Sequence, residues 1–150
     1  MKKLAELLDR ERFVHVRGTP ASEKSTLAHL LERYYVDRDK SVFYISIWKV
    51  DLREAAPWGS LTQRINSMYQ EPRVEGDLRY SNSVLLIDEA QGSYSDSVLW
   101  NSILKDVHGF KSNARVCLFS STEAHPQACR SPFTRENERL YDLKHLDVSL

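Results

Sequence analysis

The sequence predicts an α/β protein in which a mostly parallel sheet of five strands lies between two layers of helices. Two observations predict this fold. Short runs rich in β-branched and aromatic residues alternate along the chain with segments whose apolar residues recur at helical spacing. One run, 84–87, is apolar at every position, which is typical of a strand buried on both faces. Strands that alternate with helices favour a parallel sheet covered on both sides.

The helices are expected where apolar residues recur every three or four positions. A charged run over 9–12 closes the first helix, and Gly109 ends the last one. Ser60 and Gln63 have the spacing of a capping box at the start of the third. The apolar positions are Leu4, Leu7 and Leu8; Leu27, Leu30, Leu31 and Tyr34; Leu61, Ile65 and Met68; and Leu99, Ile103 and Val107.

The strands are expected where β-branched and aromatic residues gather between turn residues. These runs cover 13–17, 42–48, 84–87, 115–121 and 141–150. The carboxyl ends of parallel strands meet at one edge of a sheet, and ligands of open α/β sheets bind there. Residues that directly follow these strands are therefore the first candidates for a functional site.

Length and composition restrict the class of protein. A chain of 150 residues is one domain with room for a hydrophobic core. Basic and acidic residues number 21 each, so no charged field would attract nucleic acid or an anionic membrane. The N-terminus has no signal peptide, and no apolar run approaches the roughly 20 residues that span a bilayer. We expect an intracellular protein, cytoplasmic or nuclear, with its two cysteines reduced.

A phosphate-binding loop is predicted between the strand 13–17 and the helix that follows. A loop that runs into a helix N-terminus directs backbone N–H groups at phosphates. Gly18 permits the tight exit from the strand, Lys24 supplies a cation and Ser25 supplies a hydroxyl for Mg²⁺. The alternative is a strand–helix turn with a surface lysine and an N-capping serine. The expected nucleotide-binding residues are Gly18, Thr19, Pro20, Ala21, Ser22, Glu23, Lys24, Ser25 and Thr26.

Glu23 departs from the pattern G-x-x-x-x-G-K-[ST], which has glycine at that position. A positive φ at Glu23 would cost about 1–3 kcal/mol of backbone strain. A carboxylate about 4 Å from a phosphate charge would add roughly 4 kcal/mol of repulsion at an effective dielectric constant near 20. A side chain that turns outward would avoid much of that repulsion. The sequence therefore predicts a weakened loop and leaves its function open.

Two carboxylates follow the apolar strand 84–87. Asp88 is expected to hold Mg²⁺, and Glu89 to polarise the water that attacks the terminal phosphate. The alternative is a helix N-cap carboxylate with a solvated neighbour. Together with the loop, this pair predicts a P-loop NTPase that binds ATP and Mg²⁺.

The Asp88-Glu89 pair also distinguishes among P-loop classes. A GTPase would show Asp-x-x-Gly after this strand and an Asn-Lys-x-Asp motif, and the chain has neither. The pair favours the additional-strand ATPases with a catalytic glutamate. In that class the strand 115–121 is inserted between the strands 13–17 and 84–87.

Polar residues at the end of the strand 115–121 are candidates for sensing the γ-phosphate. Ser121 is the catalytic candidate among Ser120, Ser121 and Thr122, and the alternative is an ordinary Ser/Thr-rich turn. Arg130, Arg135 and Arg139 could stabilise charge, although solvent-facing arginines are the favoured interpretation.

The motifs resemble those of one group of proteins. The loop 17–22, followed by 24–28, resembles the Arg-Gly-Thr-Pro-Ala-Ser-Gly-Lys loop of NTPase domains in Crinkler-type and related fungal and oomycete proteins. The segments 84–91, 99–101 and 116–121 are similar to later motifs of that group. The resemblance implies nucleotide and Mg²⁺ roles for Lys24, Ser25, Asp88 and Glu89. It also implies other attached modules and delivery to a host cell.

The sequence thus predicts one P-loop NTPase core over 1–150 without a complete lid domain. Because the chain stops on an apolar strand, we expect it to be part of, or shortened from, a larger protein. The expected activity is Mg²⁺-dependent ATP hydrolysis, with a protein partner or a second copy possible. The alternatives are a degenerate scaffold for protein–protein interaction and a small-molecule phosphotransferase.

Overall fold

The computed structural model describes residues 2–18, 23–70, 73–74, 76–121 and 140–142, the last three by their backbone alone. The α-helices are α1 (Lys2–Glu11), α2 (Lys24–Val36), α3 (Pro57–Ser67) and α4 (Lys105–His108). A π-helix, Leu99–Leu104, runs directly into α4, and 3-10 turns cover Leu78–Tyr80 and Ala90–Ser93. The strands are β1 (Phe13–Gly18), β2 (Ser41–Ile45), β3 (Ser83–Ile87), β4 (Arg115–Ser121) and β5 (Leu140–Asp142).

The strands form one five-stranded sheet in the order β2-β3-β4-β1-β5. Every pairing is parallel, which confirms the predicted sheet. Four strands make its body, and the short β5 adds three residues beside β1. β4 lies between β1 and β3, as expected for the additional-strand class. β2 covers 41–45 instead of the predicted 42–48. Of the predicted strand 141–150, the structure describes only residues 141 and 142, which belong to β5.

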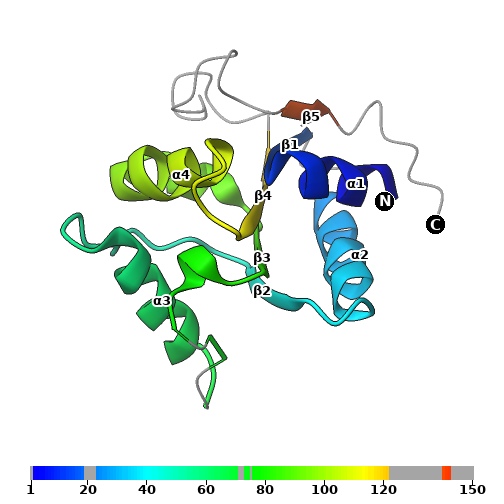
Figure 1. Ribbon diagram of the computed structural model, residues 1–150. Coiled ribbons are helices and arrows are strands. Elements are labelled where there is room, and N and C mark those ends of the chain that lie inside the picture. Colours follow the sequence, from blue (N-terminus) through cyan, green and yellow to red (C-terminus); the bar gives the residue numbers. More distant parts are fainter. Residues whose placement is uncertain (1, 19–22, 71–72, 75, 122–139, 143–150) are drawn as a thin grey trace.

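Helices cover both faces of the sheet (Figure 1). α1 and α2 lie on one side, and α3 and α4 lie on the other. The two faces have separate apolar cores because alternate residues of a strand point to opposite sides. In β1, Val14 and Val16 pack with α1 and α2, whereas Phe13 packs with the π-helix and α3. The three layers agree with the predicted architecture.

The helices mostly follow the predicted spacing, with shifts at their edges. In α2 the buried apolar residues are Leu27, Ala28, Leu31 and Tyr35, so the buried face is turned slightly from the expected one. Gly109 caps α4 at its C-terminus, as predicted. Met68, expected on the buried side of the third helix, is exposed.

The predicted capping box of the third helix is wrong. α3 begins earlier, with Pro57 in its first turn, and its N-cap residue makes no side-chain hydrogen bond. Proline suits this position because its fixed φ fits the helix and its missing N–H would have no partner there. Ser60 therefore lies inside the helix, where its Oγ accepts a hydrogen bond from the backbone N–H of Arg53 at 3.2 Å.

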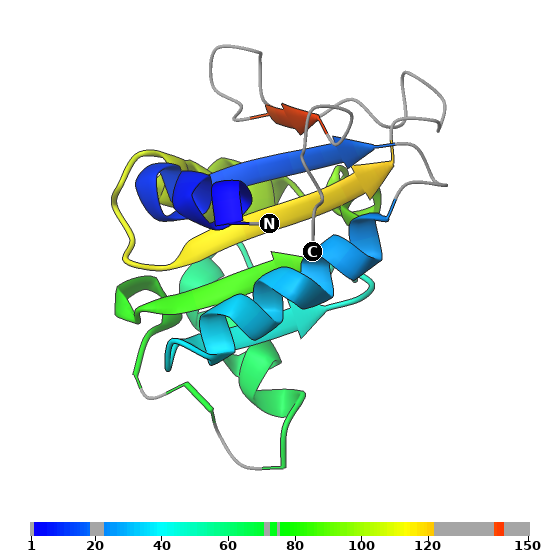
Figure 2. The same ribbon diagram turned by 90° about the vertical axis from the view of Figure 1, so that its right-hand side faces the viewer.

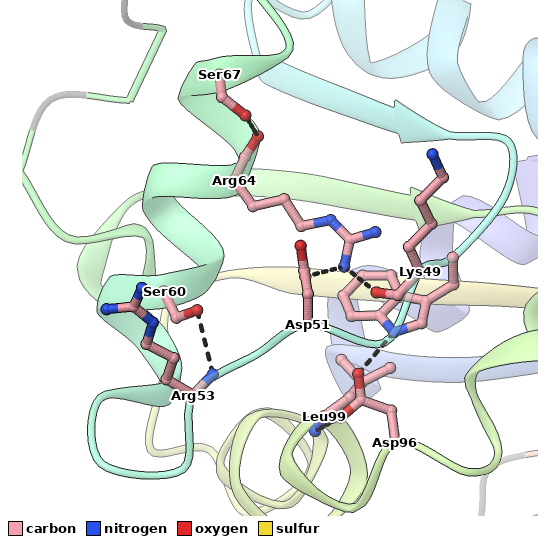
Figure 3. Close-up of polar contacts among 9 residues, drawn as sticks. Lys49, Asp51, Arg53, Ser60, Arg64, Ser67, Asp96 and Leu99 are labelled. Atoms are coloured by element: carbon pink, nitrogen blue, oxygen red, sulfur yellow. Dashed lines mark hydrogen bonds and ion pairs between the residues drawn. The ribbon is translucent and has the colours of Figure 1, made fainter.

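Hydrogen bonds connect the segment 46–56, which links β2 to α3, to Arg64 of α3 and to Asp96 (Figure 3). Arg64 of α3 donates to the backbone carbonyl of Lys49 and to Asp51 Oδ1. Trp48 Nε1 donates to Asp96 Oδ2 at 2.8 Å, and both side chains are buried. These contacts hold the segment against α3 and the start of the π-helix.

Candidate functional site

The register of the sheet brings the ends of three central strands to one edge (Figure 2). Gly18 of β1 is paired with Ser121 of β4, and Ile87 of β3 is paired with Leu118. Asp88 directly follows Ile87, and its backbone N–H donates to the carbonyl of Ile45 at the end of β2. The sequence motifs after β1, β3 and β4 therefore lie at the same carboxyl edge, where ligands of α/β sheets bind.

Ser25 and Asp88 are in direct contact at this edge. Ser25, in the first turn of α2, donates from Oγ to Asp88 Oδ2 at 2.7 Å. Asp88 is buried, and its Oδ1 accepts the backbone N–H of Glu89 at 2.9 Å. The structure therefore brings together the two residues that the sequence predicts as metal ligands.

Tyr44 is a third member of this cluster that sequence reasoning missed. Its hydroxyl donates to the same Asp88 Oδ2 at 2.7 Å. Desolvation and the bond to Asp88 raise the pKa of Tyr44 above its ordinary value. The ring of His29 from α2 stacks on it, with centroids 4.6 Å apart. The available signal was its position near the end of a predicted strand, although no motif marks a tyrosine there.

Lys24 and Glu23 lie at the N-terminus of α2. Lys24, the predicted phosphate cation, is only 4% exposed. Glu23 is the N-cap residue with φ −82° and ψ 45°, and its side chain is exposed. Because its φ is negative, the backbone strain considered for a positive φ does not arise. Gly18 and Thr26 are described as well, whereas Thr19, Pro20, Ala21 and Ser22 lie outside the described residues.

Glu89 has an unusual backbone conformation. Its φ of 48° and ψ of 45° are in the left-handed region, which costs a non-glycine residue about 1–3 kcal/mol. Such outliers cluster at functional sites. The exposed side chain accepts a hydrogen bond at Oε2 from Gln91 Nε2 at 2.5 Å. Gln91 Oε1 in turn accepts the backbone N–H of Ser121 at 3.3 Å. The predicted water-polarising residue is thus linked to the predicted sensor residue.

Two buried residues, His15 and Ser120, form a polar triangle with the partly buried Tyr94 near the end of β4. His15 Nε2 lies 2.6 Å from Ser120 Oγ, and Tyr94 Oη lies 3.1 Å from each of these atoms. The Ser120 hydroxyl therefore forms a hydrogen bond with His15, whereas the sequence indicated only that the strand ends in polar residues. No motif in the sequence connects these three residues.

The oxygen donors of the cluster fit Mg²⁺. This small, hard cation prefers carboxylate and hydroxyl oxygens, which Asp88 and Ser25 supply side by side. Among the described residues, no group of three or more His, Cys, Asp and Glu side chains lies together as a metal site. Over the same ranges, no helix is long and apolar enough to cross a membrane.

Several predicted residues lie outside the described part of the chain. They are Thr122, Cys129, Arg130, Arg135 and Arg139. Cys117, in contrast, is a buried free thiol on β4, and burial raises its pKa above the ordinary value.

Comparisons with known proteins support the fold. No protein-family model matches the chain, and no curated protein matches it. Among solved structures, it is similar to the replication initiator DnaA bound to AMPPCP and single-stranded DNA, with a TM-score of 0.56 at 15% identity. It is also similar to a DNA replication initiation factor, with a TM-score of 0.54 at 16% identity.

The two similarities cover 94% of this chain but only 43% and 44% of the respective structures. The chain thus spans less than half the length of either protein. At these identities the similarity shows the fold alone, a parallel sheet flanked by helices, which agrees with the predicted three-layer α/β core. The resemblance to Crinkler-type proteins finds no support among these matches.

Proposed function

We propose that this chain binds ATP with Mg²⁺ and hydrolyses it as the switch or motor part of a larger protein. The observation that carries the proposal is the 2.7 Å hydrogen bond between Ser25 Oγ and Asp88 Oδ2. It joins the start of α2 to the end of β3, which supports one site that combines Lys24 and Ser25 with Asp88 and Glu89. The structural neighbour DnaA is bound to AMPPCP, a triphosphate analogue, which is in keeping with ATP as ligand.

Each residue of the site has a role in this proposal. Lys24 and the N-terminus of α2 bind the phosphates, because a helix N-terminus favours anions. Ser25 and Asp88 would hold Mg²⁺, which neutralises charge on the phosphate oxygens when bound. Glu89 accepts a hydrogen bond from the attacking water and orients it. Ser121 lies beside Gly18 in the sheet register, where it can contact the terminal phosphate.

The main alternative is a degenerate scaffold that serves protein–protein interaction without hydrolysis. It was suggested by Glu23, which replaces the glycine of the phosphate-loop pattern. Its negative φ and exposed side chain remove the argument from strain and reduce the argument from repulsion. An exposed carboxylate near bound phosphates is screened by solvent and salt. We therefore favour a working site over the scaffold.

The proposal is tested by comparing the wild-type chain with Glu89→Gln. Calorimetry should show Mg·ATP binding by both proteins, because Glu89 does not hold the nucleotide. Phosphate release should occur in the wild type and fall about 10²- to 10⁴-fold in the variant, the range for loss of general-base catalysis. Glu54→Gln, at an exposed glutamate in the segment 46–56, is the matched control.

The outcomes separate the alternatives. A wild type that binds Mg·ATP without hydrolysis supports the scaffold. The absence of any Mg·ATP-dependent rise in the melting temperature also supports the scaffold, because ATP at about 100 times Kd should add about 2.7 kcal/mol to the stability of a chain that binds it. Loss of ATP only when a small-molecule acceptor is present would indicate a phosphotransferase.

The proposal extends to partners. A switch or motor core transmits its nucleotide state to a protein partner or to a second copy of the chain. We do not propose direct binding of nucleic acid, because basic and acidic residues balance and no basic aromatic surface is evident from the sequence.

A further inference from the structure

Gln91 makes two hydrogen bonds that connect separate parts of the site. Its Nε2 donates to Glu89 Oε2 at 2.5 Å, and its Oε1 accepts the backbone N–H of Ser121 at 3.3 Å. One planar amide thus spans the space between β3 and the neighbouring strand β4, at the carboxyl edge of the sheet.

The carboxylate of Glu89 needs a hydrogen-bond partner to keep it in one position. The residue is exposed and follows the end of β3 in a left-handed conformation. A glutamate has three rotatable side-chain bonds, so a free carboxylate would sample many positions. Catalysis requires a much narrower range, because a displacement of about 1 Å can cost about 100-fold in rate.

The turn that carries Gln91 is itself held in place by hydrogen bonds. Gln91 belongs to the 3-10 turn Ala90–Ser93, where Ser93 Oγ donates to the carbonyl of Ala90 at 2.6 Å. Trp100 Nε1 of the π-helix donates to the carbonyl of Ser93 at 3.0 Å, and both residues are buried. The turn that carries Gln91 is therefore anchored in the helical layer rather than in solvent.

We propose that Gln91 is a positioning residue, whose amide holds the Glu89 carboxylate against the end of β4. Ser121 is paired with Gly18, where the phosphate loop begins. The Gln91 amide therefore directs Glu89 toward the edge between β4 and β1, where the proposed function places the terminal phosphate. This inference rests on the proposed function, and it gives a role to a residue to which the sequence analysis assigned none.

The first test detects the two hydrogen bonds of Gln91 and needs no ATP hydrolysis. It follows the NMR signals of the Gln91 side-chain amide and of the Ser121 backbone amide. Glu89→Gly removes the carboxylate at a positive φ, which glycine adopts without strain. This change should shift both amide signals. In a Gln91→Ala background the same change should leave the Ser121 signal unmoved, because the connecting amide is gone.

The second test separates positioning from binding. Gln91→Ala should lower kcat for Mg·ATP hydrolysis about 10- to 100-fold while KM and the melting temperature stay close to wild type. Gln63→Ala, at an exposed glutamine of α3, is the matched control. Gln91→Glu keeps the length of the side chain but places a second carboxylate beside Glu89, so it should not restore kcat at neutral pH.

Each outcome decides the question. Amide signals of Gln91 and Ser121 that are unchanged in Glu89→Gly overturn the inference, whatever the hydrolysis rate. An active wild type whose kcat is unaffected by Gln91→Ala overturns it as well. An inactive wild type with coupled amide signals overturns the proposed hydrolysis and leaves the positioning of Glu89 by Gln91 supported.

Discussion

Ser25 and Asp88 are 63 positions apart in the sequence, yet the Ser25 hydroxyl donates to the Asp88 carboxylate at 2.7 Å. The contact forms because α2 begins at the same edge of the sheet at which β3 ends. Asp88 is buried there, so its charge needs partners. Ser25, Tyr44 and the backbone N–H of Glu89 supply three donors. Ser25 and Asp88 would hold a bound Mg²⁺ through oxygens that already lie side by side.

Replacement of Ser25 by alanine is expected to remove the contribution of Mg²⁺ to ATP binding. In the wild type, ATP should bind more tightly with Mg²⁺ than with a chelator, and Ser25→Ala should abolish this difference. The stability of the free protein should fall by less than about 1 kcal/mol, because Ser25 is exposed and Tyr44 still donates to Asp88. Calorimetry with and without Mg²⁺ measures the effect, and Ser67→Ala, on α3, is the control. A retained Mg²⁺ effect would exclude Ser25 as a ligand.

Replacement of Glu23 by glycine is expected to strengthen Mg·ATP binding by less than about tenfold, or about 1.4 kcal/mol. The residue has a negative φ and an exposed side chain, so little strain or close repulsion is relieved. Glu23→Gln separates the charge from the backbone, and it should give most of the gain if screened repulsion is the cause. Binding by the glycine variant alone would instead show that Glu23 disables the site.

The fold was largely predictable because the motifs determine the strand order. Strand, loop and helix over 13–36, and an apolar strand before Asp88, together specify an additional-strand sheet, and the observed order agrees. The contacts of Tyr44 and Gln91 were not predictable, since they depend on which strand ends are neighbours and on how the turn after Glu89 is bent. The capping box failed because α3 begins at Pro57, three residues before Ser60, and proline suits the first turn of a helix.

Asp96 is expected to be a larger contributor to stability than its neighbour in Figure 3, Asp51. Asp96 is buried and accepts Trp48 Nε1 at 2.8 Å and the backbone N–H of Leu99 at 3.1 Å. Asp96→Ala should cost about 3 kcal/mol, because it leaves a buried indole N–H unpaired and removes a charged acceptor. Asp51 is 64% exposed in its pair with Arg64, so Asp51→Ala should cost less than about 1 kcal/mol. Urea unfolding followed by tryptophan fluorescence measures both, and equal losses would contradict this assignment.

Alkaline pH is expected to destabilise the fold in two steps. Burial raises the pKa of Cys117 above its ordinary 9.0, and burial, together with the bond to Asp9, raises the pKa of Tyr35 above its ordinary 10.0. The folded chain therefore keeps protons that the unfolded chain releases, so stability is full below pH 9.0 and falls as pH rises above it. Each group adds a slope of up to about 1.4 kcal/mol per pH unit. Urea unfolding of Cys117→Ala should show the decline only above pH 10.0, where the tyrosine ionises in the unfolded chain. Tyr35→Phe should keep the first step and lower the slope of the second, to which Tyr44 also contributes because its pKa is raised as well. A decline that starts at the same pH in all three proteins would contradict this origin.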